Sequence, residues 1–238
     1  MYQIGSNRNT LTTLTREFAD GKEALCTNPL SWRVDEEFMG EGNHHGLASS
    51  ISEENIVVTG NTVIDALLDG VEKVQNLNNP IINHLRSILN PTKDLILVTG
   101  HRRENFGPNL EKIINTVKLL AKKNISFFIP VHPNPNIKKV IYKKTKNTKN
   151  IFLHKPVSFD EGIFLAKNSD IILSDSGGLQ EEASILKKKI LILRNSTERP
   201  MVLKNFGVLV GSNREKIVKL LLNFFKNNKN PIQYASPF

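Results

Sequence analysis

The chain has 238 residues, of which 39% are hydrophobic and 23% charged, a composition typical of a globular protein with a buried core. Its formal net charge is +9, which favours phosphate-bearing partners, but the lysines stand mostly beside asparagines and no aromatic residues are interleaved for base stacking. No stretch reaches the roughly 20 apolar residues of a membrane helix. We therefore expect neither a nucleic-acid partner nor membrane insertion, and a solvated lysine-rich surface.

Residues 1–50 show little hydrophobic periodicity, and a weak helix over 11–24 is the most that the pattern predicts. The start lacks the apolar segment of a secretory signal, and the single Cys26 excludes an internal disulfide, so a cytoplasmic location is expected. His44 and His45 have no further Cys or His at ligand spacing, so we expect no metal site. Residues 1–50 are predicted to be a poorly ordered or non-homologous segment.

Residues 51–238 alternate between short apolar runs and segments with apolar residues at helical spacing, which predicts one α/β domain. The predicted strands are 95–99, 125–131, 151–153, 171–173, 190–193 and 208–210. The predicted helices are 110–120, 137–142, 160–166, 179–186 and 215–225. Strands that are apolar on both faces indicate a Rossmann-like parallel sheet with helices on both faces. Ligands of such sheets bind outside the carboxyl ends of the strands.

The segment 174–182, Ser-Asp-Ser-Gly-Gly-Leu-Gln-Glu-Glu, stands between a predicted strand and a predicted helix. Gly177 and Gly178 allow a ligand close to the backbone, and the N–H groups of the helix start suit a phosphate, to which Ser176 can add a hydroxyl. Glu182 lies too far along the helix for the same phosphate and is better placed for sugar hydroxyls. The competing interpretation is ordinary helix capping, with Asp175 or Ser176 as the N-cap.

Polar side chains follow three other predicted strands. The loop 99–105 carries His101 and Arg102, which suit phosphate contacts or proton transfer, although it also reads as a surface loop with a local Arg–Glu pair. Three prolines fix the loop that carries His132, which by itself could be a rigid turn. Arg199 follows the predicted strand 190–193, on the same predicted edge as Ser176. Four strand ends therefore present phosphate-compatible side chains.

Five segments in order resemble the motifs of the non-hydrolysing UDP-N-acetylglucosamine 2-epimerases, namely 58–67, 99–105, 131–135, 174–183 and 197–200. The resemblance runs from about residue 51 to near residue 212 and implies the C-terminal half of a GT-B-like fold. It implies that His101 is catalytic and contacts the UDP-sugar phosphates. It also implies that Ser176, Gly177 and Gly178 bind the diphosphate, that Glu182 binds the ribose and that Arg199 helps to fix the nucleotide. Arg102 and His132 would contact a second UDP-sugar.

This family interconverts UDP-GlcNAc and UDP-ManNAc without NAD or metal, by eliminating UDP and adding it back. The carboxylates that resemble its acid–base apparatus belong to an N-terminal domain that residues 1–50 do not match. We therefore expect a truncated chain, inactive alone, whose partner is a separate N-terminal half or a second copy. The alternative is a non-catalytic UDP-sugar-binding or regulatory domain; glycosyl transfer is disfavoured. Lys187-Lys188-Lys189 replaces a Gly-Lys-Pro turn that is usual in the family.

Overall fold

The computed structural model describes residues 2–4, 14–17, 23–26, 62–77, 79–88 and 94–226, in two units that divide after Ala66. The first unit contains an antiparallel sheet of β1 (Tyr2–Ile4), β2 (Leu14–Glu17) and β3 (Glu23–Cys26). The predicted helix over 11–24 is therefore wrong where the structure describes it, at 14–17 and 23–24, and a β-branched residue such as Thr15 favours the extended backbone. The prediction for the rest of residues 1–50, His44 and His45 included, lies outside the described residues.

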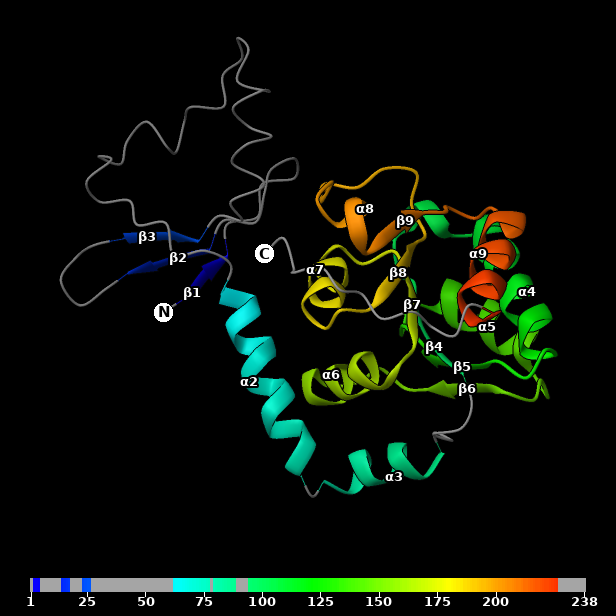
Figure 1. Cartoon of the computed structure of the whole chain (residues 1–238), viewed down its shortest axis with the longest axis horizontal. Coiled ribbons are helices and arrows are strands. Elements are labelled where there is room, and N and C mark those ends of the chain that lie inside the picture. Colours follow the sequence, from blue (N-terminus) through cyan, green and yellow to red (C-terminus); the bar gives the residue numbers. More distant parts are fainter. Residues whose placement is uncertain are drawn as a thin grey trace, which may run out of the picture. The chain divides into compact units, whose positions relative to one another are not determined.

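The second unit is built on a parallel sheet (Figure 1) in the order β6-β5-β4-β7-β8-β9. Its strands are β4 (Leu95–Thr99), β5 (Ser126–Pro130), β6 (Ile151–His154), β7 (Ile171–Ser174), β8 (Lys189–Ile192) and β9 (Gly207–Leu209). All six predicted strands are confirmed, and so is the Rossmann-like α/β class. The apolar residues of β4, β5, β7 and β8 are buried on both faces, which is why short uninterrupted runs in the sequence identified these strands, whereas those of the edge strand β6 are half-buried and Val208 of β9 is exposed.

The helices of this part of the chain are α2 (Thr62–Asn76), α3 (Pro80–Ile88), α4 (Pro108–Ala121), α5 (Pro135–Thr145), α6 (Phe159–Asn168), α7 (Gly177–Ile185), α8 (Val202–Asn205) and α9 (Arg214–Lys226), with a 3₁₀ turn η3 (Arg103–Asn105). The five predicted helices are confirmed; α2, α3 and α8 were not predicted. Prolines start α4 and α5, where a missing N–H costs nothing. Ser158 and Glu161 form a capping box that starts α6.

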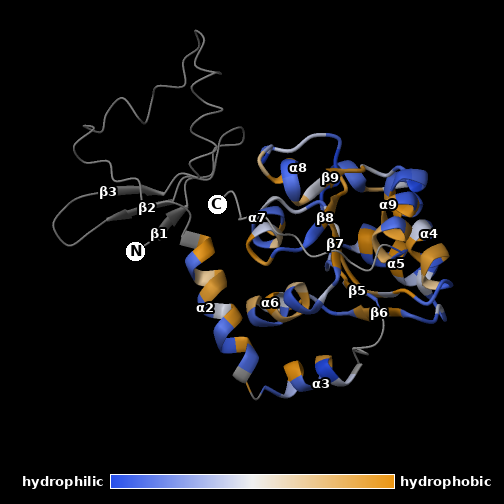
Figure 2. Cartoon of the chain, in the orientation of Figure 1, coloured by the Kyte–Doolittle hydropathy of each residue, from blue (hydrophilic) through white to orange (hydrophobic). Residues whose placement is uncertain are grey.

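The two faces of the sheet carry separate cores. Ile96 and Val98 of β4 pack in a cluster with α4, α5 and α9, whereas Leu95 and Leu97 pack in a second cluster that includes α2, α3 and α6. Helices therefore cover both faces (Figure 1), and hydrophobic residues concentrate along the strands between them (Figure 2). None of the described helices is long and apolar enough to span a lipid bilayer.

The order of the strands creates a switch point between β4 and β7. From β4 the chain continues outward to β5 and β6, and from β7 it continues the other way to β8 and β9. In sheets of this kind, ligands bind in the crevice outside the carboxyl ends of the two strands at the switch point. The four polar loops predicted from the sequence follow β5, β4, β7 and β8, which are neighbours in the sheet.

Candidate functional site

The start of α7 lies directly at the switch point. Ser176 is the N-cap of this helix, and its hydroxyl accepts a hydrogen bond from the backbone N–H of Leu179 at 3.4 Å. Behind it, the Ser174 hydroxyl accepts from the Ser176 N–H at 3.0 Å and lies 2.6 Å from the hydroxyl of Thr99 on β4. Ser176 rather than Asp175 is thus the cap, and the N-terminus of α7 is turned toward the carboxyl edge of the sheet, where an anion is favoured.

Asp175 joins the loops that follow β4 and β7. Its side chain is fully buried, and both oxygens accept from the backbone N–H of His101 at 3.1 Å. One oxygen also accepts from the Arg102 N–H and from the side-chain amide of Asn105, each at 2.9 Å. That amide also donates to the Leu193 carbonyl at 3.0 Å. Asp175 therefore holds the His101–Arg102 segment, a role that sequence reasoning missed when it considered only capping.

His101 and His132 come together from two loops. Their rings stack, with centroids 5.7 Å apart and an interplanar angle of 16°. The His101 side chain is 45% exposed, and its Nδ1 lies 3.5 Å from a carboxylate oxygen of Asp175. Nδ1 of His132 accepts the backbone N–H of Asn134 at 3.2 Å. The predicted site residues in the loops after β4 and β5 thus form one accessible cluster beside the start of α7.

Arg199 reaches the same helix start from the loop after β8. Its Nε donates to the buried carboxylate of Glu181, and its backbone N–H donates to the Thr197 hydroxyl at 3.1 Å. The guanidinium lies against Gly177, where an added Cβ would stand only 2.6 Å from Nη1. The Arg199 guanidinium, which also lies 3.6 Å from Glu198, and the positive end of the α7 dipole therefore converge on one place, an arrangement that suits a bound anion.

A second arginine braces this loop. Arg194 is 9% exposed, and its guanidinium donates to both oxygens of Glu198, at 2.6 and 2.8 Å. Its Nε also donates to Glu104 at 3.1 Å, which ties the loop after β8 to the loop after β4. The hydrogen bond from Arg194 lowers the pKa of Glu198 to about 2. The local Arg–Glu pair suggested for the loop 99–105 is therefore wrong for Glu104, whose partner is 90 residues away.

Glu182 lies one turn further along α7 and is half-buried. Burial raises the pKa of its carboxyl, and the neighbouring charge of Glu181 raises it further. A Cβ added at Gly178 would lie 3.9 Å from a carboxylate oxygen of Glu182. Glu182 is thus close to the glycine pair but behind the first N–H groups of the helix.

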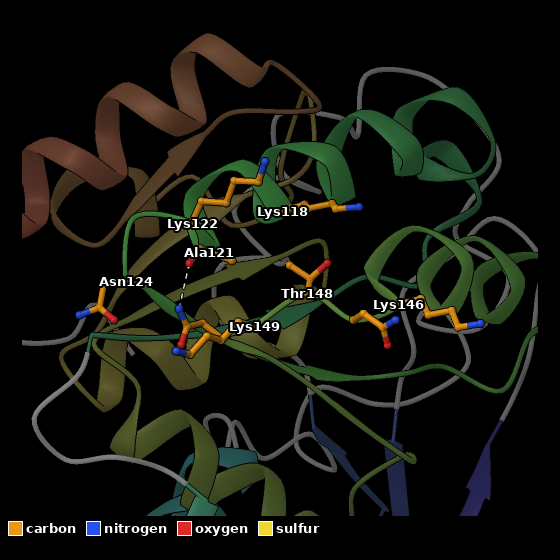
Figure 3. Close-up of a pocket in the computed structure, with 9 residues that line it drawn as sticks. Lys118, Ala121, Lys122, Asn124, Lys146, Thr148 and Lys149 are labelled. Carbon is orange, nitrogen blue, oxygen red and sulfur yellow. Dashed lines mark hydrogen bonds between the residues drawn. The ribbon is translucent and has the colours of Figure 1, made fainter.

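A pocket of about 440 Å³ lies elsewhere, at the opposite edge of the sheet (Figure 3). It is lined by Ala121 and Thr148, by Asn124, Asn147 and Asn150, and by Lys118, Lys122, Lys146 and Lys149. Lysines are favoured there without any ligand, because the carboxyl ends of α4 and α5 carry partial negative charge. Among the described residues, no group of three or more His, Cys, Asp or Glu side chains is placed to hold a metal ion.

Comparisons with known proteins agree on one family. The family model described as UDP-N-acetylglucosamine 2-epimerase matches residues 41–238. A UDP-N-acetylglucosamine 2-epimerase of Salmonella borreze is 45% identical over 168 residues, covering 69% of this chain and 44% of that protein. One of Campylobacter jejuni is 43% identical over 176 residues, covering 71% of this chain and 46% of that protein. The chain spans about half the length of these curated relatives.

Solved structures give the same answer. The crystal structure of UDP-GlcNAc 2-epimerase from Neisseria meningitidis bound to UDP-GlcNAc is similar, with a TM-score of 0.68 and 38% identity, over 77% of this chain and 50% of that one. The Methanocaldococcus jannaschii enzyme in complex with UDP-GlcNAc and UDP has a TM-score of 0.64 and 32% identity, over 81% of this chain and 53% of that one. The chain belongs to the UDP-N-acetylglucosamine 2-epimerase family.

Proposed function

We propose that residues 51–238 form the UDP-sugar-binding half of an isomerase that interconverts UDP-GlcNAc and UDP-ManNAc. One observation carries the proposal: the Arg199 guanidinium lies on the N-terminus of α7, at the switch point of the sheet. Two solved relatives, from Neisseria meningitidis and Methanocaldococcus jannaschii, are described as bound to UDP-GlcNAc. The diphosphate of a UDP-sugar is the anion that this convergence of positive charge fits.

In this proposal the diphosphate lies across the start of α7. Gly177 and Gly178 leave room for its oxygens beside the backbone N–H groups, and the Ser176 hydroxyl adds a donor. Arg199 supplies the fixed cation, oriented by the buried carboxylate of Glu181. Glu182, further along the helix, accepts hydrogen bonds from the ribose hydroxyls of the uridine.

His101 is the candidate catalytic residue. Elimination of UDP places growing negative charge on the diphosphate, and an imidazole beside it stabilises that charge by donating a hydrogen bond. The same donors hold UDP for its return to C1 of the sugar. Arg102 and His132 belong to the proposed contact with a second UDP-sugar. No organic cofactor or metal is needed for these steps.

Proton transfer at C2 requires carboxylates that this half does not supply, because in the resemblance they belong to the N-terminal domain. The chain alone should therefore bind UDP-sugars without turning them over. A separate N-terminal half or a second copy of the chain is the proposed partner, and the cytoplasm remains the predicted location. A non-catalytic UDP-sugar-binding or regulatory domain is the second candidate.

The experiment that tests this function follows UDP-GlcNAc by NMR in D₂O with the purified chain. We expect no exchange of the C2 proton with the chain alone, and exchange together with UDP-ManNAc formation after the N-terminal half of the Campylobacter jejuni relative is added. An Arg199→Ala chain with the same added half should be inactive. Binding without exchange, even with the added half, would support the non-catalytic domain and contradict the epimerase.

A further inference from the structure

Asp175 meets His101 in two separate ways. Its carboxylate accepts the backbone N–H of His101, with both oxygens at 3.1 Å, and this contact fixes the loop. Oδ1 of Asp175 also lies 3.5 Å from Nδ1 of the His101 imidazole, and this contact concerns the ring itself. Because Asp175 is fully buried at the end of β7, its position relative to the ring is set by the sheet rather than by solvent.

The contact at Nδ1 bears on which ring nitrogen of His101 carries hydrogen. An ionised carboxylate can only accept hydrogen bonds, so the ring nitrogen that faces it is favoured when it bears hydrogen. The neighbouring ring of His132 has the opposite arrangement, because its Nδ1 accepts the backbone N–H of Asn134 and must be unprotonated. The stacked pair therefore combines an Nδ1–H tautomer at His101 with an Nε2–H tautomer at His132.

We propose that Asp175 is a positioning residue that fixes the tautomer of His101 and makes Nε2 the ring atom that meets a bound diphosphate. When the ring is charged, Nδ1–H faces Asp175 and Nε2–H is available to donate to a phosphate oxygen. When it is neutral, Nδ1–H still faces Asp175 and Nε2 carries the lone pair. The part of this inference that concerns the diphosphate rests on the proposed function.

The substitution Asp175→Asn distinguishes control of the His101 tautomer from a role that only holds the loop in place. Its carbonyl oxygen can still accept from the Arg102 N–H and the Asn105 amide, which both meet the same carboxylate oxygen in the native chain. Its NH₂ group would then occupy the place of the other oxygen and face Nδ1 of His101. Because a donor then faces this nitrogen, the neutral ring should move its hydrogen to Nε2.

The test records long-range ¹H–¹⁵N NMR spectra of the full chain at about pH 8.5, above the ordinary titration range of histidine. The native chain should show Nδ1–H at His101 and Nε2–H at His132. Asp175→Asn should switch His101 to Nε2–H and leave His132 unchanged. Asp170→Asn is the matched control, since Asp170 accepts the Leu95 N–H at 2.7 Å near the other end of β7, and it should leave both rings unchanged.

An Nε2–H tautomer at His101 in the native chain would overturn the proposal, and this result does not require any variant to fold. A His101 tautomer that is the same in the native and Asp175→Asn chains would overturn it as well, as would an equal change in Asp170→Asn. UDP affinity, titrated separately, should fall roughly tenfold in Asp175→Asn and stay native in Asp170→Asn. A native chain with the expected tautomers but no affinity for UDP supports the role of Asp175 and contradicts the proposed function.

Discussion

The guanidinium of Arg199 fills the space that a side chain at Gly177 would need. A Cβ at Gly177 would lie 2.6 Å from Nη1 and 3.0 Å from Cζ of Arg199, whereas a Cβ at Gly178 would have only a carboxylate oxygen of Glu182 within 4 Å, at 3.9 Å. The two adjacent glycines therefore have different reasons to be glycine. The first admits the arginine, whereas a Cβ at the second would make only an ordinary van der Waals contact with Glu182.

Alanine at these two positions should have opposite effects on stability. Gly177→Ala pushes Arg199 away from the buried Glu181 carboxylate and should cost about 1–3 kcal/mol in the free energy of unfolding. Gly178→Ala should raise it by about 0.5–1 kcal/mol, because alanine is the better helix former. Urea unfolding of both variants measures the difference. Equal effects would contradict the placement of Arg199 on Gly177.

Glu182→Gln should increase stability at neutral pH while weakening nucleotide binding. Burial raises the pKa of Glu182, so the unfolded chain releases this proton first and the native chain loses stability as the pH rises above about 4.5. Glutamine removes that loss, and the variant and native chains should converge near pH 4. UDP affinity should fall roughly tenfold, because the proposed ribose acceptor is altered. Unfolding at pH 4 and pH 7 with a UDP titration tests both parts.

Glu198→Gln should flatten the loss of stability in acid. Because the hydrogen bond from Arg194 lowers the pKa of Glu198 to about 2, its contribution is complete above about pH 4.5 and disappears as the pH falls toward 2. The Glu198 side chain is 58% exposed, so solvent screening limits the effect to about 1 kcal/mol or less. Thermal unfolding between pH 2 and 6 measures it, with Glu215→Gln on α9 as the control. A native pH dependence in Glu198→Gln would contradict this account.

Lys187→Gly should stabilise the chain. Lys187 has a φ of 54° directly after α7, and the N–H of Lys188 donates to the Ala183 carbonyl at 2.8 Å, as in a helix end that ordinarily carries glycine. Removing the side chain relieves a left-handed conformation and should add about 1 kcal/mol. Lys188→Gly, without a positive φ, should be neutral or destabilising. A stability gain in Lys188→Gly but not in Lys187→Gly would contradict the assignment of the helix end.

The sequence predicted the strands and the loops that form the site better than the side-chain contacts between those loops. Strands such as β4 are buried on both faces, so their apolar runs were plain, and their polar ends could be located from the sheet rule alone. The contacts of Asp175 with the loop after β4, and of Arg194 with Glu104, join residues 70 to 90 positions apart and depend on the register of β4, β7 and β8. No local pattern encodes that register.

The lysine triplet 187–189 shows a second feature that the sequence alone did not predict correctly. In the sequence it stands out only as a departure from the family's usual Gly-Lys-Pro turn, yet Lys187 occupies the left-handed position that ends α7. The Lys189 amine donates to the Asn205 carbonyl at 2.6 Å, and burial lowers its pKa. The charge of the segment suggests a solvated surface. The backbone of Lys187 nevertheless has the left-handed conformation that glycine adopts without strain. The helices α2 and α3 were not predicted, although apolar residues recur at helical spacing in both, as at Ile64, Leu67, Val71 and Val74 of α2.

The central claim is that the start of α7 together with Arg199 binds the diphosphate of a UDP-sugar. Calorimetric titration of the chain with UDP tests it most directly, repeated with Ser176→Ala, Arg199→Ala and Lys122→Ala. The account predicts that UDP binds, that the first two variants lose roughly tenfold or more in affinity, and that Lys122→Ala, which removes a cation from the opposite edge of the sheet, binds as the native chain does. No binding by the folded native chain, or an equal loss in Lys122→Ala, would contradict it.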